Sequence, residues 1–232
     1  MFRSIVVPLD LDVVGDRALP VAGSLARLGG LPIELLTISS PRMAGFVDAC
    51  ELDRRVKLHG LGPHSINILY DDDAGRAITR YIGGRDDALV VMGSSAKGPL
   101  RELTMGSVSE HVLAHAHRPI LIVGPNVEVV DTASAPSLVV GLDAADLADA
   151  AITVIEAWQR TFGGEVTAVE DLGEDLGNAV VVATSTGWTR PGVHWHSTAR
   201  QLARHSIRPV LVVPADRTAR AGKVPAHRDV GP

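Results

Sequence analysis

The sequence predicts an α/β fold made of two doubly wound parallel sheets. Short, nearly continuous apolar runs alternate with longer stretches of helical pattern, which is typical of parallel strands covered by helices on both faces. The same order of runs then starts again in the second half of the chain in a shorter form. A chain of 232 residues suffices for one large or two small domains, since a domain has roughly 150 residues.

Five apolar runs in the first half are expected to be its strands. They are rich in Ile, Val and Leu, which favour buried strands. The runs are residues 5–9, 33–38, 65–70, 88–92 and 120–123.

The stretches between these runs carry helix signals. Residues 14–28 have a helical pattern that ends at Gly29-Gly30, where glycine allows a left-handed helix end. Residues 74–82 follow three aspartates, which suit the positive N-terminal end of a helix. A further helix is expected over residues 107–116, and residues 42–60 form a polar, weakly helical stretch.

Two segments of the first half recur in the second. Residues 4–10 (SIVVPLD) line up with 137–143 (SLVVGLD), and residues 115–123 (HAHRPILIV) with 205–213 (HSIRPVLVV). The recurring segments are closer together in the second half, so this half lacks a middle part. Its strands at 165–169 and 180–183 follow each other almost directly.

The missing part corresponds to the third strand and its flanking helices. A deletion is tolerated only where it spares the centre of a sheet, so the third strand is expected at an edge. This predicts the strand order 3-2-1-4-5 in the first half and a reduced order 2-1-4-5 in the second.

The domain boundaries follow from these patterns. Residues 1–125 form the first domain, 136–214 the shortened second domain and 215–232 a charged, aperiodic tail expected to be disordered. The fifth strands of the two domains would pair within one chain, which covers both open edges and makes a pseudo-dimer. Whether two chains form a homodimer stays open.

Composition excludes several classes of function. A net charge of −5 and 3% aromatic residues do not suit nucleic-acid binding, which needs basic surface and stacking rings. No apolar run approaches the roughly 18 residues that span a membrane. A single cysteine, Cys50, cannot form an internal disulfide, which fits the reducing cytoplasm.

The expected site lies beyond the carboxyl ends of the first and fourth strands. Ligands of doubly wound sheets bind there, where the strand order reverses. Asp10 ends the first strand, the fourth runs into the small residues from Gly93 to Gly98, and Gly106 and Ser107 open a helix. Such a loop and helix N terminus hold phosphate through backbone amides and the helix dipole. The same residues would also serve simply as a turn and a helix cap.

At these residues the chain resembles the universal stress protein family. That family carries Gly-x-x-Gly, nine residues, and then Gly-Ser or Gly-Thr. Here Gly93-Ser94-Ser95-Ala96 is followed by nine residues and Gly106-Ser107, with Ala96 in place of the second glycine. The surrounding segments IVVPLD, GSVSEHVL and RPILIV match as well. The resemblance covers residues 3–124 and, in part, 137–214, which implies a tandem member with a shortened second domain.

The resemblance implies an adenine-nucleotide site in the first domain, for ATP or AMP with or without Mg²⁺. Asp10 would meet the adenine or ribose, Ile38 would line the base, and Met92 and Gly93 would pass under the ribose. The phosphates would lie on the loop of Ser95, Ala96 and Gly98 and on the amides of Gly106, Ser107 and Val108.

Two functions from different classes are open. The first is stress or energy sensing by nucleotide binding, with at most slow ATP hydrolysis, because no acid–base pair accompanies the loop. Pro99 stands where a Walker A loop has its lysine, which argues against P-loop hydrolysis. No metal site is expected, since His111 and His115 have no evident third ligand. The alternative is a scaffold of the same fold that binds no nucleotide.

The second domain is a weaker candidate for a ligand site. Ala183 and His196 occupy the positions that align with Gly93 and Gly106. We expect Trp188 and Trp195 to fill the vestigial pocket and make this domain structural. An aromatic ligand site built from these tryptophans is the alternative.

Overall fold

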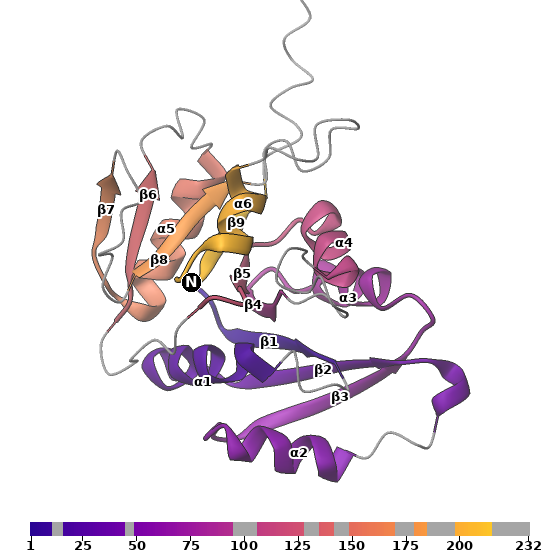
Figure 1. The fold of residues 1–232 in the computed structure, drawn as a ribbon. Coiled ribbons are helices and arrows are strands. Elements are labelled where there is room, and N and C mark those ends of the chain that lie inside the picture. Colours follow the sequence, from indigo (N-terminus) through magenta and orange to yellow (C-terminus); the bar gives the residue numbers. More distant parts are fainter. Residues whose placement is uncertain are drawn as a thin grey trace, which may run out of the picture.

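The computed structural model describes residues 1–10, 16–44, 49–94, 106–127, 135–141, 149–169, 179–184 and 198–214. These residues form one sheet of nine strands in the order β3-β2-β1-β4-β5-β9-β8-β6-β7, with helices on both faces (Figure 1). Three predicted features lie outside the described residues: the loop of Ser95, Ala96 and Gly98, the Trp188 and Trp195 region with His196, and the tail 215–232.

The first half has the predicted strands in the predicted order. β3-β2-β1-β4-β5 are all parallel, with β1 at the centre and β3 at the edge. The strands are β1 (Ser4–Leu9), β2 (Ile33–Ser39), β3 (His64–Tyr70), β4 (Ala88–Gly93) and β5 (Ile120–Val123).

The helices of the first half also follow the predicted pattern, with one difference. The weakly helical stretch divides into a short 3₁₀ helix, which Pro41 starts, and α2. The helices are α1 (Ala18–Gly29), η2 (Pro41–Met43), α2 (Ala49–Leu58), α3 (Ala74–Gly83) and α4 (Ser107–His115).

Two helix ends form as the sequence indicates. Gly30 ends α1 with φ 63°, a left-handed conformation that glycine adopts without strain. Asp73 caps α3, and its Oδ1 accepts a hydrogen bond from the Arg76 amide at 2.9 Å.

The second half repeats the arrangement without a third strand in its described part. The order β9-β8-β6-β7 is parallel and corresponds to the reduced order 2-1-4-5 expected from the sequence. Its elements are β6 (Ser137–Gly141), α5 (Asp149–Phe162), β7 (Val166–Val169), β8 (Ala179–Thr184), α6 (Thr198–His205) and β9 (Val210–Val213).

The two halves join through their fifth strands, as the sequence predicts. β5 and β9 are antiparallel, with Ile120 opposite Val212 and Ile122 opposite Val210. All residues of both strands are buried. The pairing turns two open edges into the interior of one sheet.

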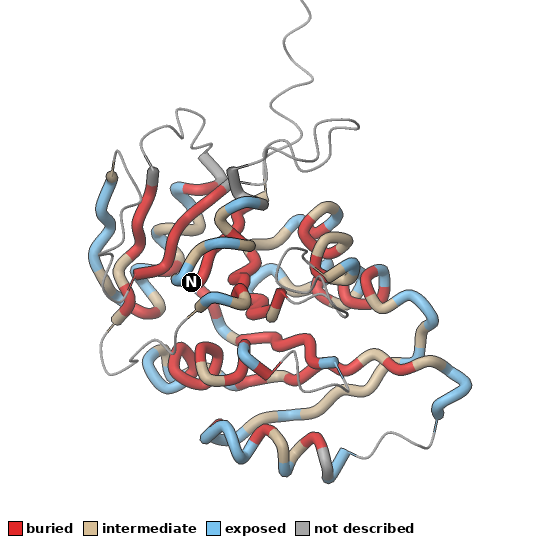
Figure 2. Tube along the Cα trace, viewed as in Figure 1, coloured by how far each residue is buried: buried red, intermediate tan, exposed pale blue. Residues whose placement is uncertain are grey.

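Two apolar clusters cover opposite faces of the sheet. The central strands are largely buried (Figure 2). Successive residues of a strand point to opposite faces, so Ile5 and Val7 of β1 lie in one cluster and Val6 in the other. The first cluster includes residues of α1, α2 and α5, and the second includes residues of α3, α4 and α6.

Within the described part of the chain, none of the helices has both the length and the apolar character of a membrane span.

Candidate functional site

Three of the predicted site residues meet at the carboxyl end of the central strands. Leu9 pairs with Thr37, so Asp10 and Ile38 are the next positions on adjacent strands. Met92 lies near the end of β4, the other neighbour of β1. Met92 and Ile38 belong to the cluster on the α3 and α4 face. Asp10 directly follows β1 and is four residues after Val6, so it falls on the same face of the sheet as Val6, which lies in that cluster.

The N terminus of α4 lies at the end of β4. Ser109 is 3% exposed, and its hydroxyl donates a hydrogen bond to the Gly93 carbonyl oxygen at 3.1 Å. Val108 packs against the same cluster as Met92. The structure therefore brings Gly93, the first turn of α4 and the ends of β1 and β2 to one edge of the sheet.

The small size of Gly106 leaves the backbone amides at the start of α4 uncovered. It is the N-cap of α4 with φ −62° and ψ 142°, a conformation open to any residue. The described glycines with positive φ are Gly30, Gly60, Gly163 and Gly164. Because glycine has no side chain, this N-cap residue does not cover the backbone amides of the first turn of α4.

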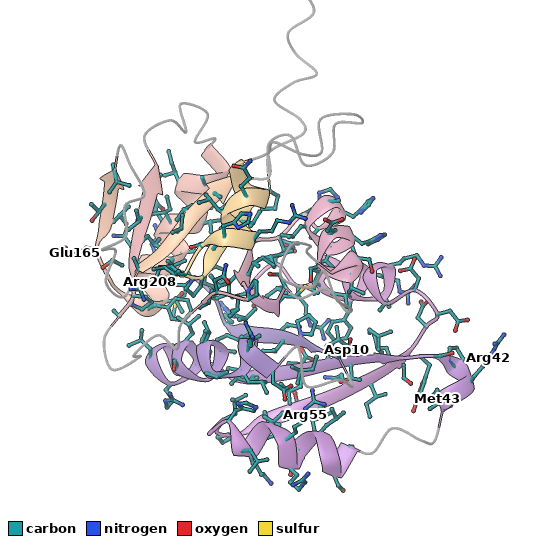
Figure 3. The ribbon with its side chains drawn as sticks, viewed as in Figure 1. Asp10, Arg42, Met43, Arg55, Glu165 and Arg208 are labelled. Carbon is teal, nitrogen blue, oxygen red and sulfur yellow. The ribbon has the colours of Figure 1, made fainter. Side chains whose placement is uncertain are left out.

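Asp10 is held by a residue that sequence reasoning missed. Nη2 of Arg55, on α2, donates to the Asp10 carbonyl oxygen at 2.8 Å and to Asp16 Oδ1 at 2.6 Å (Figure 3). His59 follows one turn later, with its Nε2 3.6 Å from Asp16 Oδ2. Arg55 lies on α2 and His59 in the turn directly after it, and Asp16 comes from a distant part of the chain, so no local sequence pattern indicates this contact.

The Asp16–Arg55 pair is largely out of solvent. The side chains are 6% and 12% exposed. An ion pair in such surroundings is weakly screened by salt, and Arg55 links α2 to the end of β1 and to the turn that precedes α1. The end of β1 is therefore fixed from the face opposite to α3 and α4.

The aspartates before α3 act as a cap and as part of a surface charge cluster. A hydrogen bond from the Asp73 amide, followed by one from Arg80, lowers the pKa of Asp71. Asp72 Oδ1 accepts a hydrogen bond from the Ser40 hydroxyl at 2.8 Å, which ties the ends of β2 and β3 together. Of the described residues, no group of three or more His, Cys, Asp or Glu could hold a metal ion.

The arrangement offers two kinds of contact along one edge. Ile38 is partly exposed and supplies apolar surface, whereas Met92 is 5% exposed. Asp10 is exposed, and its carboxylate is able to accept hydrogen bonds. The first turn of α4 supplies backbone N–H groups and the positive end of a helix dipole. This suits a ligand with an apolar ring, hydroxyl groups and an anionic end.

Comparisons with known proteins agree with this fold. The model of the Universal stress protein family matches residues 1–124. A universal stress protein from Archaeoglobus fulgidus DSM 4304 aligns with TM-score 0.68 at 17% identity, over 91% of this chain and 98% of its own. A functionally unknown protein from Pseudomonas aeruginosa PAO1 aligns with TM-score 0.63 at 14% identity, over 93% of both chains. No curated protein matches the chain.

Proposed function

Because the chain belongs to the universal stress protein family, we propose that its first half binds an adenine nucleotide, ATP or AMP, at the carboxyl edge of β1, β2 and β4. The role is stress or energy sensing through binding, without efficient catalysis. The observation that carries the proposal is the Ser109–Gly93 hydrogen bond, which joins the uncovered start of α4 to the end of β4.

The contacts proposed for the nucleotide follow the two parts of this edge. The Asp10 carboxylate accepts a hydrogen bond from the ribose or adenine, Ile38 lines the base, and Met92 and Gly93 lie under the ribose. The amides of Gly106, Ser107 and Val108 hold the phosphates, because N–H groups at a helix start favour anions. Ser95, Ala96 and Gly98 complete the phosphate site in the proposal, and Mg²⁺ would accompany ATP.

We also propose that the chain is a tandem member of the family, with domains at 1–125 and 136–214 and a tail at 215–232. The support is the repeated strand order on either side of the β5–β9 pair. The second domain has Ala183 and His196 in place of the glycines of the first at the aligned positions, so we assign it a structural role. A cytoplasmic location is proposed on composition, since a chain with one cysteine suits a reducing compartment.

The sharpest test changes a backbone donor without changing the fold. Ser107 is the first residue of α4, where proline is well tolerated because its fixed φ suits the helix start. Gly106 already has the extended conformation that a following proline requires. Ser107→Pro therefore removes one amide N–H and fills the space in front of it. Ser107→Ala is the matched control, since it keeps that amide.

Calorimetric titration with ATP should separate these variants. A hydrogen bond to a charged group contributes about 1.5–3 kcal/mol, so Ser107→Pro should weaken ATP binding about tenfold or more. Ser107→Ala should lose much less. A wild-type protein that gives no heat and no thermal stabilisation at millimolar ATP would overturn the proposal and favour the scaffold function.

A further inference from the structure

The second half of the chain contacts the first half beside the proposed site. Because β9 runs antiparallel to β5, the end of α6 that precedes β9 lies at the carboxyl end of β5. Ser94 Oγ donates to the Ala203 carbonyl oxygen at 3.5 Å, and Asn126 Nδ2 donates to the Arg204 carbonyl oxygen at 3.3 Å. We call these four residues, together with Gly124, the α6 seam.

Gly124 makes the closest approach in the α6 seam. A Cβ atom at this position would lie 2.8 Å from the Ala203 carbonyl oxygen. That oxygen belongs to the backbone of α6 and cannot rotate away as a side chain would. The α6 seam is therefore a closely packed contact between the strand ends of the first half and the last turn of α6.

The α6 seam continues into the proposed phosphate site. The Ser94 amide donates to the Val123 carbonyl oxygen at 3.0 Å, which joins the ends of β4 and β5. Gly93, the residue before Ser94, accepts the hydrogen bond of Ser109 from the first turn of α4. Ser94 and Ser109 are each 3% exposed. A continuous path of buried and partly buried contacts thus runs from α6 through the end of β4 to the start of α4.

We infer that the second half is a positioning element for the nucleotide site of the first half. The α6 seam fixes the position of the end of β4. The Ser109–Gly93 hydrogen bond then holds the start of α4, with its backbone amides, against the end of β4. This inference rests on the proposed function. It gives the second half a role in ligand binding although its own aligned positions lack the glycines of the first.

The path predicts which part of the ligand depends on the α6 seam. The seam leads to the amides that would hold phosphates. Asp10 and Ile38, which would contact the ribose and base, are held by β1, β2 and Arg55 of α2 instead. Gly93, which would lie under the ribose, also belongs to the end of β4 that the seam fixes. Damage to the seam should therefore weaken binding of ATP more than binding of adenosine.

Gly124→Ala tests this directly, because the added methyl group forces α6 away from β5. Gly62→Ala is the matched control: a methyl group added there would have no atom within 4 Å, and it precedes β3, away from the seam. Calorimetry with full-length protein should show ATP affinity of Gly124→Ala reduced about fivefold or more, the lower range of measured couplings between sites. Adenosine affinity should fall much less, and Gly62→Ala should bind both ligands as the wild type does.

Ser94→Ala provides a milder second variant in case Gly124→Ala does not fold, and it should show the same preferential loss for ATP. Equal losses for ATP and adenosine would mean general destabilisation and would overturn the inference. Unchanged ATP binding in the folded variants would overturn it as well. If the wild type binds neither ligand, the proposed function itself fails and the inference falls with it.

Discussion

Asp16 and Arg55 form an ion pair that is more deeply buried than the surface pairs of the helices. Removal of one partner from a buried pair leaves the other charge without compensation, which costs about 3 kcal/mol or more. Arg55→Met should lower the free energy of unfolding by about this amount, as measured by urea denaturation.

Arg160→Met is the matched control for Arg55→Met. Its ion pair with Glu156 is four residues apart on α5, and the side chains are 66% and 51% exposed. Such pairs contribute about 0.5 kcal/mol or less. Equal effects of the two substitutions would show that the Arg55 pair is solvated and does not fix the end of β1.

Tyr81 gives a residue-level test at high pH. Burial, then the hydrogen bond to the Glu34 carboxylate, raise the pKa of Tyr81 to about 12 from its ordinary value of 10.0. Between these two pH values the unfolded chain loses the phenol proton and the folded protein keeps it. The free energy of unfolding should therefore fall as pH rises through this range.

Tyr81→Phe isolates that contribution, since it keeps the ring and removes the titrating group. The wild type should lose more stability between pH 10 and 12 than Tyr81→Phe does, as followed by chemical denaturation at each pH. Parallel curves for the two proteins would mean that Tyr81 titrates alike in both states.

At the scale of elements, α3 and α4 are packed so closely that a glycine is required between them. A Cβ at Gly75 would lie 2.7 Å from Cγ and 2.8 Å from Cβ of His111. These atoms are at the root of the imidazole and cannot move aside without moving α4. Gly75→Ala should thus destabilise the protein by about 1–3 kcal/mol, the usual cost of overpacking.

A second substitution checks the cause. In a His111→Gly background both the opposing ring and its Cβ are absent, so Gly75→Ala should destabilise the protein much less. Thermal unfolding of the two single variants and the double variant measures this coupling. An unchanged cost of Gly75→Ala in both backgrounds would place its origin outside the α3–α4 contact.

The elements themselves were largely readable from the sequence. Apolar runs such as 120–123 gave strands with those bounds, and Asp73 and Gly30 ended their helices as their chemistry requires. The exception was the stretch around α2, which has few apolar residues on its buried side. Its packing depends on Val56 and on Arg55, whose partners come from distant parts of the chain.

The placement of three candidate site residues followed from the same patterns. Parallel strand order alone brings Asp10, Ile38 and Met92 to one edge of the sheet, and their role in binding stays a prediction. The hydrogen bonds from Arg55 to Asp10 and from Ser94 to Ala203 join residues far apart in sequence. Such contacts depend on how helices pack on the sheet, which no local pattern encodes.

At the scale of the whole molecule, the β5–β9 pair should make the two halves unfold together. All three tryptophans, Trp158, Trp188 and Trp195, lie in the second half, whereas far-UV circular dichroism reports on the whole chain. Urea unfolding followed by fluorescence and by circular dichroism should give one coincident transition. Two separated midpoints would show that the halves are independent units.

The proposed adenine-nucleotide site comprises the start of α4 and the ends of β1 and β2. A crystal structure of the protein grown with ATP would locate the nucleotide. We expect phosphate oxygens within hydrogen-bond distance of the amides of Gly106, Ser107 and Val108, with the base against Ile38 and a hydrogen bond to Asp10. Nucleotide bound only in the second half, between Asp143 and Ser197, or no bound nucleotide at saturating ATP, would contradict this proposal.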